Sequence, residues 1–145
     1  MGYFDSSYIA KFYLDEPESE AVRRLAESLG QVRCAMIGQI EVAAVFHRKF
    51  REGAFDAGAF REVMAQFDDD CSQGLWTWLP LTTALAAKAA AAFARLPRPA
   101  FLRAAETVHL ICAQEHGLRE IYTSDRHMSS AARHFRLKPM TVAPA

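Results

Sequence analysis

The chain has few cysteines and no excess of charge of either sign. Its three cysteines, Cys34, Cys71 and Cys112, are far apart and form no Cys-x-x-Cys pair. This odd, scattered set argues against a disulfide framework or a zinc site and is typical of a reducing cytoplasm, where we expect the protein to reside. The 17 basic and 17 acidic side chains give a formal net charge of +0. Any nucleic-acid contact would therefore need a local basic patch.

Long apolar runs are missing as well. The alanine-rich stretch 83–94 is interrupted by Lys88 and is too short to span a bilayer. The first residues lack the basic flank and apolar region of a secretion signal, so we expect no membrane partner. A chain of 145 residues that is 51% hydrophobic suits one folded domain rather than a disordered segment. We find no repeat or linker, and we expect residues 1–145 to form a single domain.

Short apolar runs alternate with helical patterns along the whole chain. The expected strands cover residues 2–5, 32–36, 75–79, 120–123 and 138–142. The expected helices cover residues 8–13, 16–29, 37–50, 56–70, 83–95, 100–116 and 126–135. Ser6 or Ser7 is expected to cap the first helix. This alternation predicts an α/β domain with a parallel sheet covered on both faces.

Four carboxylates stand where a charge is out of place. Asp5 ends the apolar run 2–4, and Asp125 ends the stretch 120–124. Glu41 and Glu106 lie among the apolar residues of two expected helices. Burying an unpaired carboxylate is costly, so several such positions in one small domain indicate that something compensates them. A divalent cation bound by oxygen ligands is the simplest compensator, and it would also support catalysis.

The predicted topology can bring two of these acids together. Ligands of an open parallel sheet gather at the carboxyl ends of the strands, near the point where the strand order reverses. Asp5 and Asp125 both lie at expected carboxyl ends. Ser7 and Thr123 are short hydroxyl residues beside them that can hydrogen-bond and orient the carboxylates, as a metal site requires.

Several of these residues also have an ordinary structural interpretation. An Asp after a strand, such as Asp5, is usually a helix cap. Glu106 has Arg103 at helical spacing, a pattern more often found in surface ion pairs than in metal sites. His109 is more often a packed histidine than a general base. The case for a site therefore depends on all four acids occurring together in one compatible topology.

The residues around these acids resemble those of the PIN-domain ribonucleases, in particular the VapC-type toxins of toxin–antitoxin pairs. The matching stretches follow the family's order across nearly the whole chain and are Tyr3–Glu16, Ile40–Val42, Leu102–Leu110 and Tyr122–Arg126. The resemblance implies a three-layer α/β/α PIN fold, a Mg²⁺ or Mn²⁺ cofactor and endonucleolytic cleavage of RNA. The usual third acid of the family is Asp, and in this chain it is Glu106.

On this resemblance we expect Asp5 and Asp125 to ligate the metal, with Glu41 and Glu106 completing the site directly or through water. All four are therefore expected to be catalytic. Their expected supporting residues are Ser7 and Thr123. The cations expected to hold the RNA backbone are Arg103, Arg126 and Lys11. The expected protein partners are a cognate antitoxin and, as is common in the family, a second copy of the chain.

Two other functions stay open at this point. Glu106 at a usual Asp position motivates a PIN-like module that has weakened catalysis and acts through protein or RNA binding. An aspartyl nucleophile at Asp5, as in haloacid-dehalogenase-type phosphatases, ranks lower. Those enzymes usually carry a second Asp two residues later, where this chain has Ser7.

Overall fold

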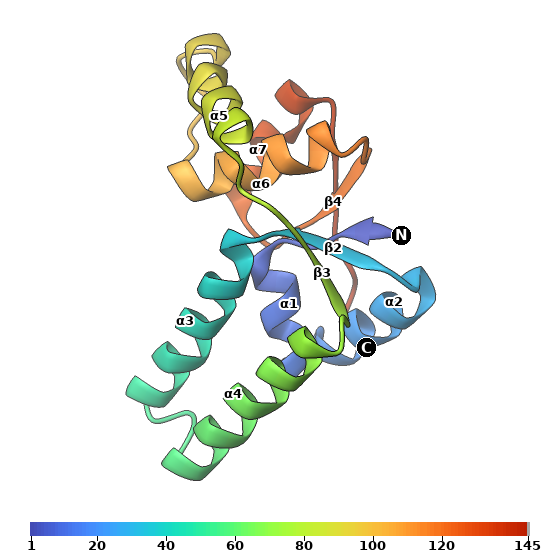
Figure 1. Cartoon of the computed structure of the whole chain (residues 1–145), viewed down its shortest axis with the longest axis vertical. Helices are drawn as coiled ribbons and strands as arrows, with labels where there is room; N and C mark the ends of the chain where they lie inside the picture. The colour runs from blue at the N-terminus through green and yellow to red at the C-terminus, as the bar shows by residue number, and fades with distance from the viewer. Residues whose placement is uncertain (145) are drawn as a thin grey trace.

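Five short strands alternate with seven α-helices in the computed structural model, which describes residues 1–144 (Figure 1). The strands are β1 (Gly2–Tyr3), β2 (Val32–Ala35), β3 (Trp76–Leu79), β4 (Glu120–Tyr122) and β5 (Lys138–Met140). The helices are α1 (Ser6–Tyr13), α2 (Ser19–Leu29), α3 (Ile37–Arg51), α4 (Ala57–Ser72), α5 (Thr83–Arg95), α6 (Ala104–Glu115), α7 (Arg126–Ala131) and a 3₁₀ turn, η1 (Ala132–Phe135). The predicted alternation of strands and helices is confirmed.

Every strand pairing is parallel. Strands β1, β2 and β3 form one ladder, with β2 in the middle, and β4 pairs with β5. A bridge between Phe4 and Tyr122 joins the two ladders, and the Asp5 amide donates to the Tyr122 carbonyl at 3.0 Å. The strand order is therefore β3-β2-β1-β4-β5. The order reverses between β1 and β4, which is where ligands of such sheets bind.

Successive strand residues point into two separate cores. Tyr3 of β1 packs with residues of α5, α6 and α7, whereas its neighbour Phe4 packs with residues of α1, α3 and α4. Ile121 and Tyr122 divide between the two cores in the same way. Because side chains alternate along a strand, both faces of the sheet are buried. Figure 1 shows α1–α4 on one side of the strands and α5–α7 on the other, the predicted three-layer α/β/α arrangement.

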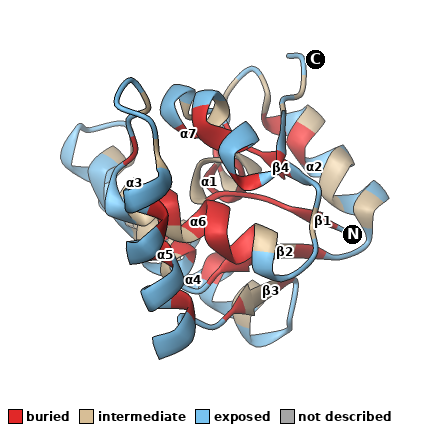
Figure 2. Cartoon of the chain, turned by 90° about the horizontal axis from the view of Figure 1, so that it is seen from above, coloured by how far each residue is buried: buried red, intermediate tan, exposed pale blue. Residues whose placement is uncertain are grey.

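Helix α6 is the most deeply buried helix of residues 1–144. Seven of its twelve residues are buried, and Figure 2 shows it as an almost continuous red segment between exposed helices. It packs against β2 and α5. No helix of the described residues combines the length and the apolar character needed to cross a membrane.

Two helices begin later than the sequence pattern predicts. Helix α6 starts at Ala104 rather than residue 100, because residues 97–100 form a turn, with the Ala100 amide donating to the Pro97 carbonyl at 2.9 Å, and Arg103 is extended at the N-cap. Helix α2 starts at Ser19 rather than Glu16, whose amide instead donates to the Ser19 hydroxyl at 2.9 Å. The predicted end of α2 at Gly30 is confirmed, with a φ of 69° that glycine adopts readily.

Candidate functional site

Asp5 and Asp125 cap two helices that leave neighbouring strands. Asp5 follows β1 and accepts a hydrogen bond from the Tyr8 amide at 3.1 Å, so it caps α1 in place of the predicted Ser6 or Ser7. Asp125 follows β4 and accepts from the Met128 amide at 2.8 Å, at the start of α7. β1 and β4 meet at the reversal of strand order, so both carboxylates stand at the same edge of the sheet.

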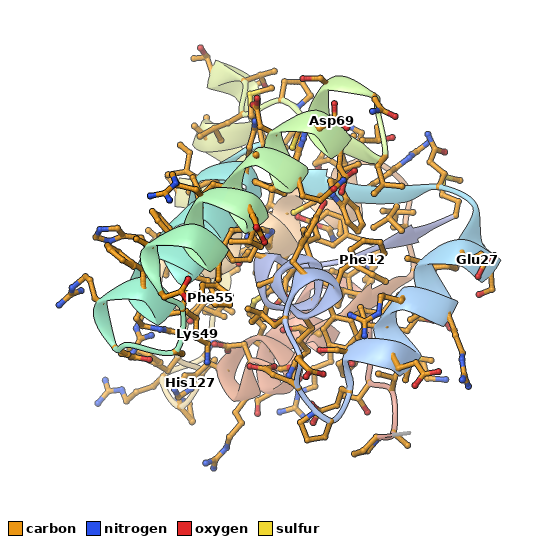
Figure 3. The ribbon with its side chains drawn as sticks, turned by 90° about the horizontal axis from the view of Figure 1, so that it is seen from below. Phe12, Glu27, Lys49, Phe55, Asp69 and His127 are labelled. Atoms are coloured by element: carbon orange, nitrogen blue, oxygen red, sulfur yellow. The ribbon has the colours of Figure 1, made fainter. Side chains whose placement is uncertain are left out.

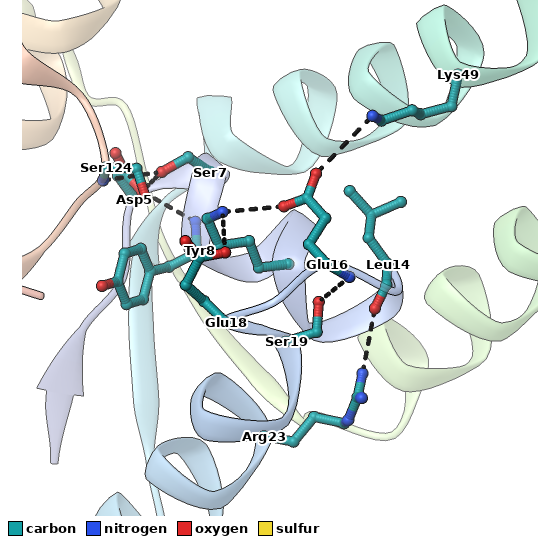
Figure 4. A network of polar contacts seen from close by, with 11 residues as sticks. Asp5, Ser7, Tyr8, Leu14, Glu16, Glu18, Ser19, Arg23, Lys49 and Ser124 are labelled. Carbon is teal, nitrogen blue, oxygen red and sulfur yellow. Dashed lines mark hydrogen bonds and ion pairs between the residues drawn. The ribbon is translucent and has the colours of Figure 1, made fainter. Parts of the chain in front are cut away.

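Two hydroxyl groups connect these aspartates. Thr123 donates its hydroxyl to Oδ2 of Asp5 and accepts from the Asp125 amide at 2.9 Å. Ser7 donates to Oδ1 of Asp5 at 2.5 Å and accepts from the Ser124 amide at 3.3 Å. Figure 4 shows the Asp5, Ser7 and Ser124 part of this arrangement. Both oxygens of Asp5 are thus held by donors from β1–α1 and β4–α7, which fixes the carboxylate between the two connections.

The Asp5 carboxylate is buried without a cationic partner. It is 3% exposed, and no Lys, Arg or His of residues 1–144 forms an ion pair with it. Loss of hydration raises the pKa of Asp5, although His109 and the hydrogen bonds from Ser7, Thr123 and Tyr8 act in the opposite direction. The folded protein therefore holds a carboxylate that would be stabilised by a nearby cation.

Glu41 is held by a buried histidine. Oε1 of Glu41 lies 2.6 Å from Nε2 of His109, a ring that is 2% exposed. Nδ1 of His109 lies 2.7 Å from the Tyr3 hydroxyl, which accepts from the Ala35 amide at 2.9 Å. Burial raises the pKa of Tyr3 well above its usual value, so its hydroxyl keeps a proton. The Tyr3 hydroxyl can donate a hydrogen bond to Nδ1, which leaves Nε2 as the ring atom that donates a hydrogen bond to Glu41.

Glu106 folds back on the start of its own helix. Its Oε2 accepts from the Arg103 amide at 2.8 Å, and its Oε1 lies 3.8 Å from the Arg103 guanidinium. A Glu three residues into a helix that bonds the N-cap amide is half of a capping box. The carboxylate is 9% exposed, so the interpretation as an ordinary surface pair does not hold. Glu106 is a buried helix-capping residue in this state.

The four acids are not gathered into one cluster in this structure. Within residues 1–144, no three His, Cys, Asp or Glu side chains lie close enough together to hold a metal ion. Asp5 and Asp125 are adjacent through Thr123, whereas Glu41 and Glu106 are bound by His109 and Arg103. All four still offer carboxylate oxygens, the donors that Mg²⁺ and Mn²⁺ prefer. The buried, unpaired Asp5 fits such an ion. Glu41 can keep one oxygen on His109 while the other faces the ion, whereas Glu106 would have to turn from the Arg103 amide.

The three cations predicted to contact RNA differ in their availability. Lys11 lies 2.9 Å from Glu16 and 3.3 Å from Glu18, so its charge is already compensated. Arg103 and Arg126 are exposed. A role in RNA binding stays a prediction for all three.

Sequence reasoning did not identify the basic side chains beside Glu41. Arg48 and Arg51 line an open cleft of about 430 Å³ together with Glu41 and Ser6. Arg48 follows Glu41 by seven residues, and this spacing on a helix was the available signal that both share one face. No sequence pattern predicted the role of Tyr3 at the site. Its contacts with Ala35 and His109 depend on the sheet register and on how α6 packs against the sheet.

Comparison with known proteins assigns the sequence to a family. A family model described as PIN domain matches residues 2–134, nearly the whole chain. No curated protein matches the chain at a significant level.

Proposed function

Since the chain belongs to the PIN-domain family, we propose that it is a Mg²⁺- or Mn²⁺-dependent endoribonuclease and the toxin of a VapC-like toxin–antitoxin pair. PIN domains are generally metal-dependent nucleases that bind nucleic acid. One observation carries the proposal for this chain. Asp5 is a buried carboxylate without a cation, linked through Thr123 to Asp125 at the point where the strand order reverses.

The proposed metal ligands are Asp5 and Asp125, with Glu41 and Glu106 binding directly or through water. When bound, Mg²⁺ or Mn²⁺ would acidify water and neutralise the negative charge that develops on the phosphate. A side-chain nucleophile is unnecessary for this hydrolysis. Asp5 is also a poor candidate for one, because both of its oxygens already accept hydrogen bonds.

The chain's own residues would fix the carboxylates before RNA binds. Ser7 and Thr123 donate to the two oxygens of Asp5 and limit its rotation. The Tyr3 hydroxyl orients the His109 ring, which in turn holds Glu41. Such outer hydrogen bonds raise the affinity of a site for its metal by reducing the freedom its ligands lose on binding.

We further propose that the substrate is single-stranded RNA or an exposed loop, because its backbone can enter an open acidic site more easily than a paired helix can. Arg103 and Arg126 would hold the phosphates next to Glu106 and Asp125. Lys11 would join them only after leaving Glu16 and Glu18.

A second candidate function is a PIN-like module with weak or no catalysis that acts through protein or RNA binding. The observation that favours it is the state of the two glutamates. Glu41 is bound by His109 and Glu106 caps α6, so two of the four proposed ligands are engaged elsewhere. If neither glutamate presents a free oxygen to the metal, the site would have only two carboxylates.

Exposed apolar side chains support the proposed protein partners, a cognate antitoxin and a second copy of the chain. Ile40 is 72% exposed, and Met36 and Leu81 are 46% and 47% exposed. Met36 and Leu81 follow neighbouring strands, since the Met36 amide donates to the Leu79 carbonyl at 2.8 Å. Apolar groups exposed together in this way are typical of protein interfaces.

The test is an RNA-cleavage assay with purified protein in Mg²⁺ or Mn²⁺. Wild type is compared with Asp5→Asn and Glu106→Gln, and each reaction is repeated with excess chelator. We expect wild type to cut internal phosphodiester bonds, the chelator to stop cutting, and Asp5→Asn to abolish it while the protein stays folded. Undiminished cleavage by Asp5→Asn would refute the proposed site. Tight RNA binding without any cleavage by wild type would favour the non-catalytic module.

A further inference from the structure

A cleft lies between the segment that precedes α6 and helix α7. It has a volume of about 490 Å³, within the range of ligand-binding pockets. One wall carries Pro97, Pro99 and Phe101, and the other carries His127, Arg133 and His134. Figure 3 shows His127 at the outer edge of the molecule. Phe101, His127 and Arg133 are exposed, so the cleft opens to solvent.

The two segments that form this cleft carry positive charge only. Residues 97–103 and 126–136 contain five arginines and two histidines and no Asp or Glu, in a chain with 17 basic and 17 acidic residues. Of these arginines, only Arg103 has an acidic partner within residues 1–144, Glu106 at 3.8 Å, and its side chain is still 71% exposed. The neutral chain thus has the local basic patch that binding a polyanion requires.

An exposed aromatic ring stands inside this basic patch. Phe101 is 53% exposed, an unusual position for a phenylalanine. Its ring centroid lies 4.8 Å from that of His127, with an angle of 73° between the planes, and the Arg103 guanidinium lies 6.0 Å from the ring. Exposed aromatic rings interleaved with arginines are the arrangement by which proteins bind single-stranded nucleic acid, with the rings stacking on bases and the cations holding phosphates.

Both walls of the cleft continue into elements that carry the proposed metal ligands. The segment with Phe101 leads into Arg103, whose amide donates to Glu106 at the start of α6. The other wall belongs to α7, which Asp125 caps. A nucleotide bound in the cleft would place the adjoining backbone beside the carboxylates.

From these observations we infer that this cleft binds a nucleobase of single-stranded RNA. The base stacks on Phe101, and the flanking phosphates contact Arg103 and Arg133. The inference rests on the proposed function, since it assigns a substrate-binding site beside the same carboxylates. It is independent of the metal, because no residue of the cleft is a proposed ligand.

The test measures binding of a fluorescein-labelled single-stranded RNA by fluorescence anisotropy with excess chelator, so that no cleavage occurs. Phe101→Ala is compared with Phe101→Trp, which keeps an aromatic ring, and with Phe50→Ala, which removes another exposed phenylalanine at the end of α3. Loss of one base–aromatic stacking contact weakens the affinity for RNA by at least about fivefold. We expect Phe101→Ala to weaken binding by that factor or more, and Phe101→Trp and Phe50→Ala to stay near wild type.

A second pair of variants tests the phosphate contact. Arg133→Ala is compared with Arg61→Ala, an exposed arginine on α4. Each lost phosphate contact on a single strand reduces the slope of log affinity against log salt by about 0.7. We expect this reduction for Arg133→Ala only.

Three results would overturn the inference. One is equal RNA affinity of Phe101→Ala and wild type, and another is no RNA binding by wild type in chelator. The third is binding of labelled poly-glutamate with the same dependence on Phe101 and Arg133, which would assign the cleft to an acidic protein segment. If RNA binds through Phe101 but wild type does not cut it when Mn²⁺ is added, the proposed catalysis fails and the inference stands.

Discussion

The Nε2 atom of His109 lies 2.6 Å from the Oε1 atom of Glu41, and this contact connects α6 with α3 across the buried end of the site. The ring cannot turn freely, because Tyr3 holds its other nitrogen at 2.7 Å. Glu41 is 30% exposed as a side chain, so one of its carboxylate oxygens can face a ligand while the other is held. This pair is the basis of the first prediction.

Replacing His109 by Leu should lower the affinity of the protein for Mn²⁺ by about 10- to 100-fold, the usual effect of removing a residue that orients a ligand. Without the His109 N–H donor, the Glu41 side chain would be free to rotate. Metal binding would then have to fix its conformation, which lowers the affinity. Isothermal titration of Mn²⁺ measures this directly. His109→Gln, which keeps an N–H donor, should recover part of the affinity. Equal affinities for His109→Leu and wild type would show that the contact is structural only.

Asp5→Asn should make the metal-free protein more stable at neutral pH. The folded-state pKa of Asp5 is raised, so the folded state binds the proton more tightly than the unfolded state does. The free energy of unfolding then falls as pH rises from the unfolded-state pKa through the raised folded-state pKa. Asn carries no charge and still caps a helix well. Thermal unfolding in chelator should therefore show a higher Tm for Asp5→Asn at pH 7.

This gap in Tm should shrink as the pH is lowered, because wild-type Asp5 then becomes neutral in the folded state. Asp15→Asn, which changes an exposed carboxylate, is the matched control and should show no such gap. Adding Mn²⁺ should reverse the order at neutral pH by stabilising wild type and not Asp5→Asn. A lower Tm for Asp5→Asn at pH 7 in chelator would contradict the assignment of Asp5 as a charge that requires a cation.

Glu106→Gln separates the capping role of Glu106 from its charge. Gln at this position can still accept from the Arg103 amide and complete the capping box. We expect the free energy of unfolding to stay near that of wild type, whereas Glu106→Ala should lose about 1 kcal/mol with the cap. RNA cleavage should fall strongly in both variants. If Glu106→Gln cleaves as well as wild type, Glu106 is a cap and not a ligand.

Gly38 lies where α3 passes β2, and its substitution should disturb the fold beneath the site. A Cβ at Gly38 would overlap the Cys34 sulfur and would lie 3.3 Å from Trp78 and 3.5 Å from the His109 ring. Gly38→Ala should therefore lower the free energy of unfolding by about 1–3 kcal/mol, the usual cost of overpacking. Urea unfolding measures the change.

Gly58→Ala on α4 is the control for this prediction. Its Cβ would meet only Asp56 at an ordinary 3.4 Å, and alanine favours a helix more than glycine does. We expect Gly58→Ala to be neutral or stabilising. Equal effects of the two substitutions would show that the tight packing at Gly38 has no energetic consequence.

The architecture was predictable from the sequence because each strand carries its own local signal. The run that ends at Asp5 is short and apolar, and the run before Asp125 is short and carries Ile121 and Tyr122. The intervening segments have helical periodicity, so parallel strands with helices on both faces follow directly. Helix starts were less predictable. The apolar pattern continues through residues 100–103, but the turn at 97–100 and the extended N-cap Arg103 place the start of α6 four residues later.

The site was predictable only in part, because topology positions some of its residues and tertiary packing positions the others. Asp5 and Asp125 follow strands that pair through Phe4 and Tyr122, so topology alone places them together. The directions of Glu41 and Glu106 depend on hydrogen bonds with His109 and the Arg103 amide. Those partners are set by the packing of α6 against β2, a tertiary contact that helical spacing does not encode.

The most direct test of the central claim is a crystal structure of the protein grown with Mn²⁺, with data collected for the anomalous signal of manganese. We predict one anomalous peak between the carboxylates of Asp5 and Asp125, with a carboxylate oxygen of Glu41 or Glu106 directed toward it. No peak at that position under saturating Mn²⁺, with Asp5 still bound only by Ser7, Thr123 and the Tyr8 amide, would contradict the account.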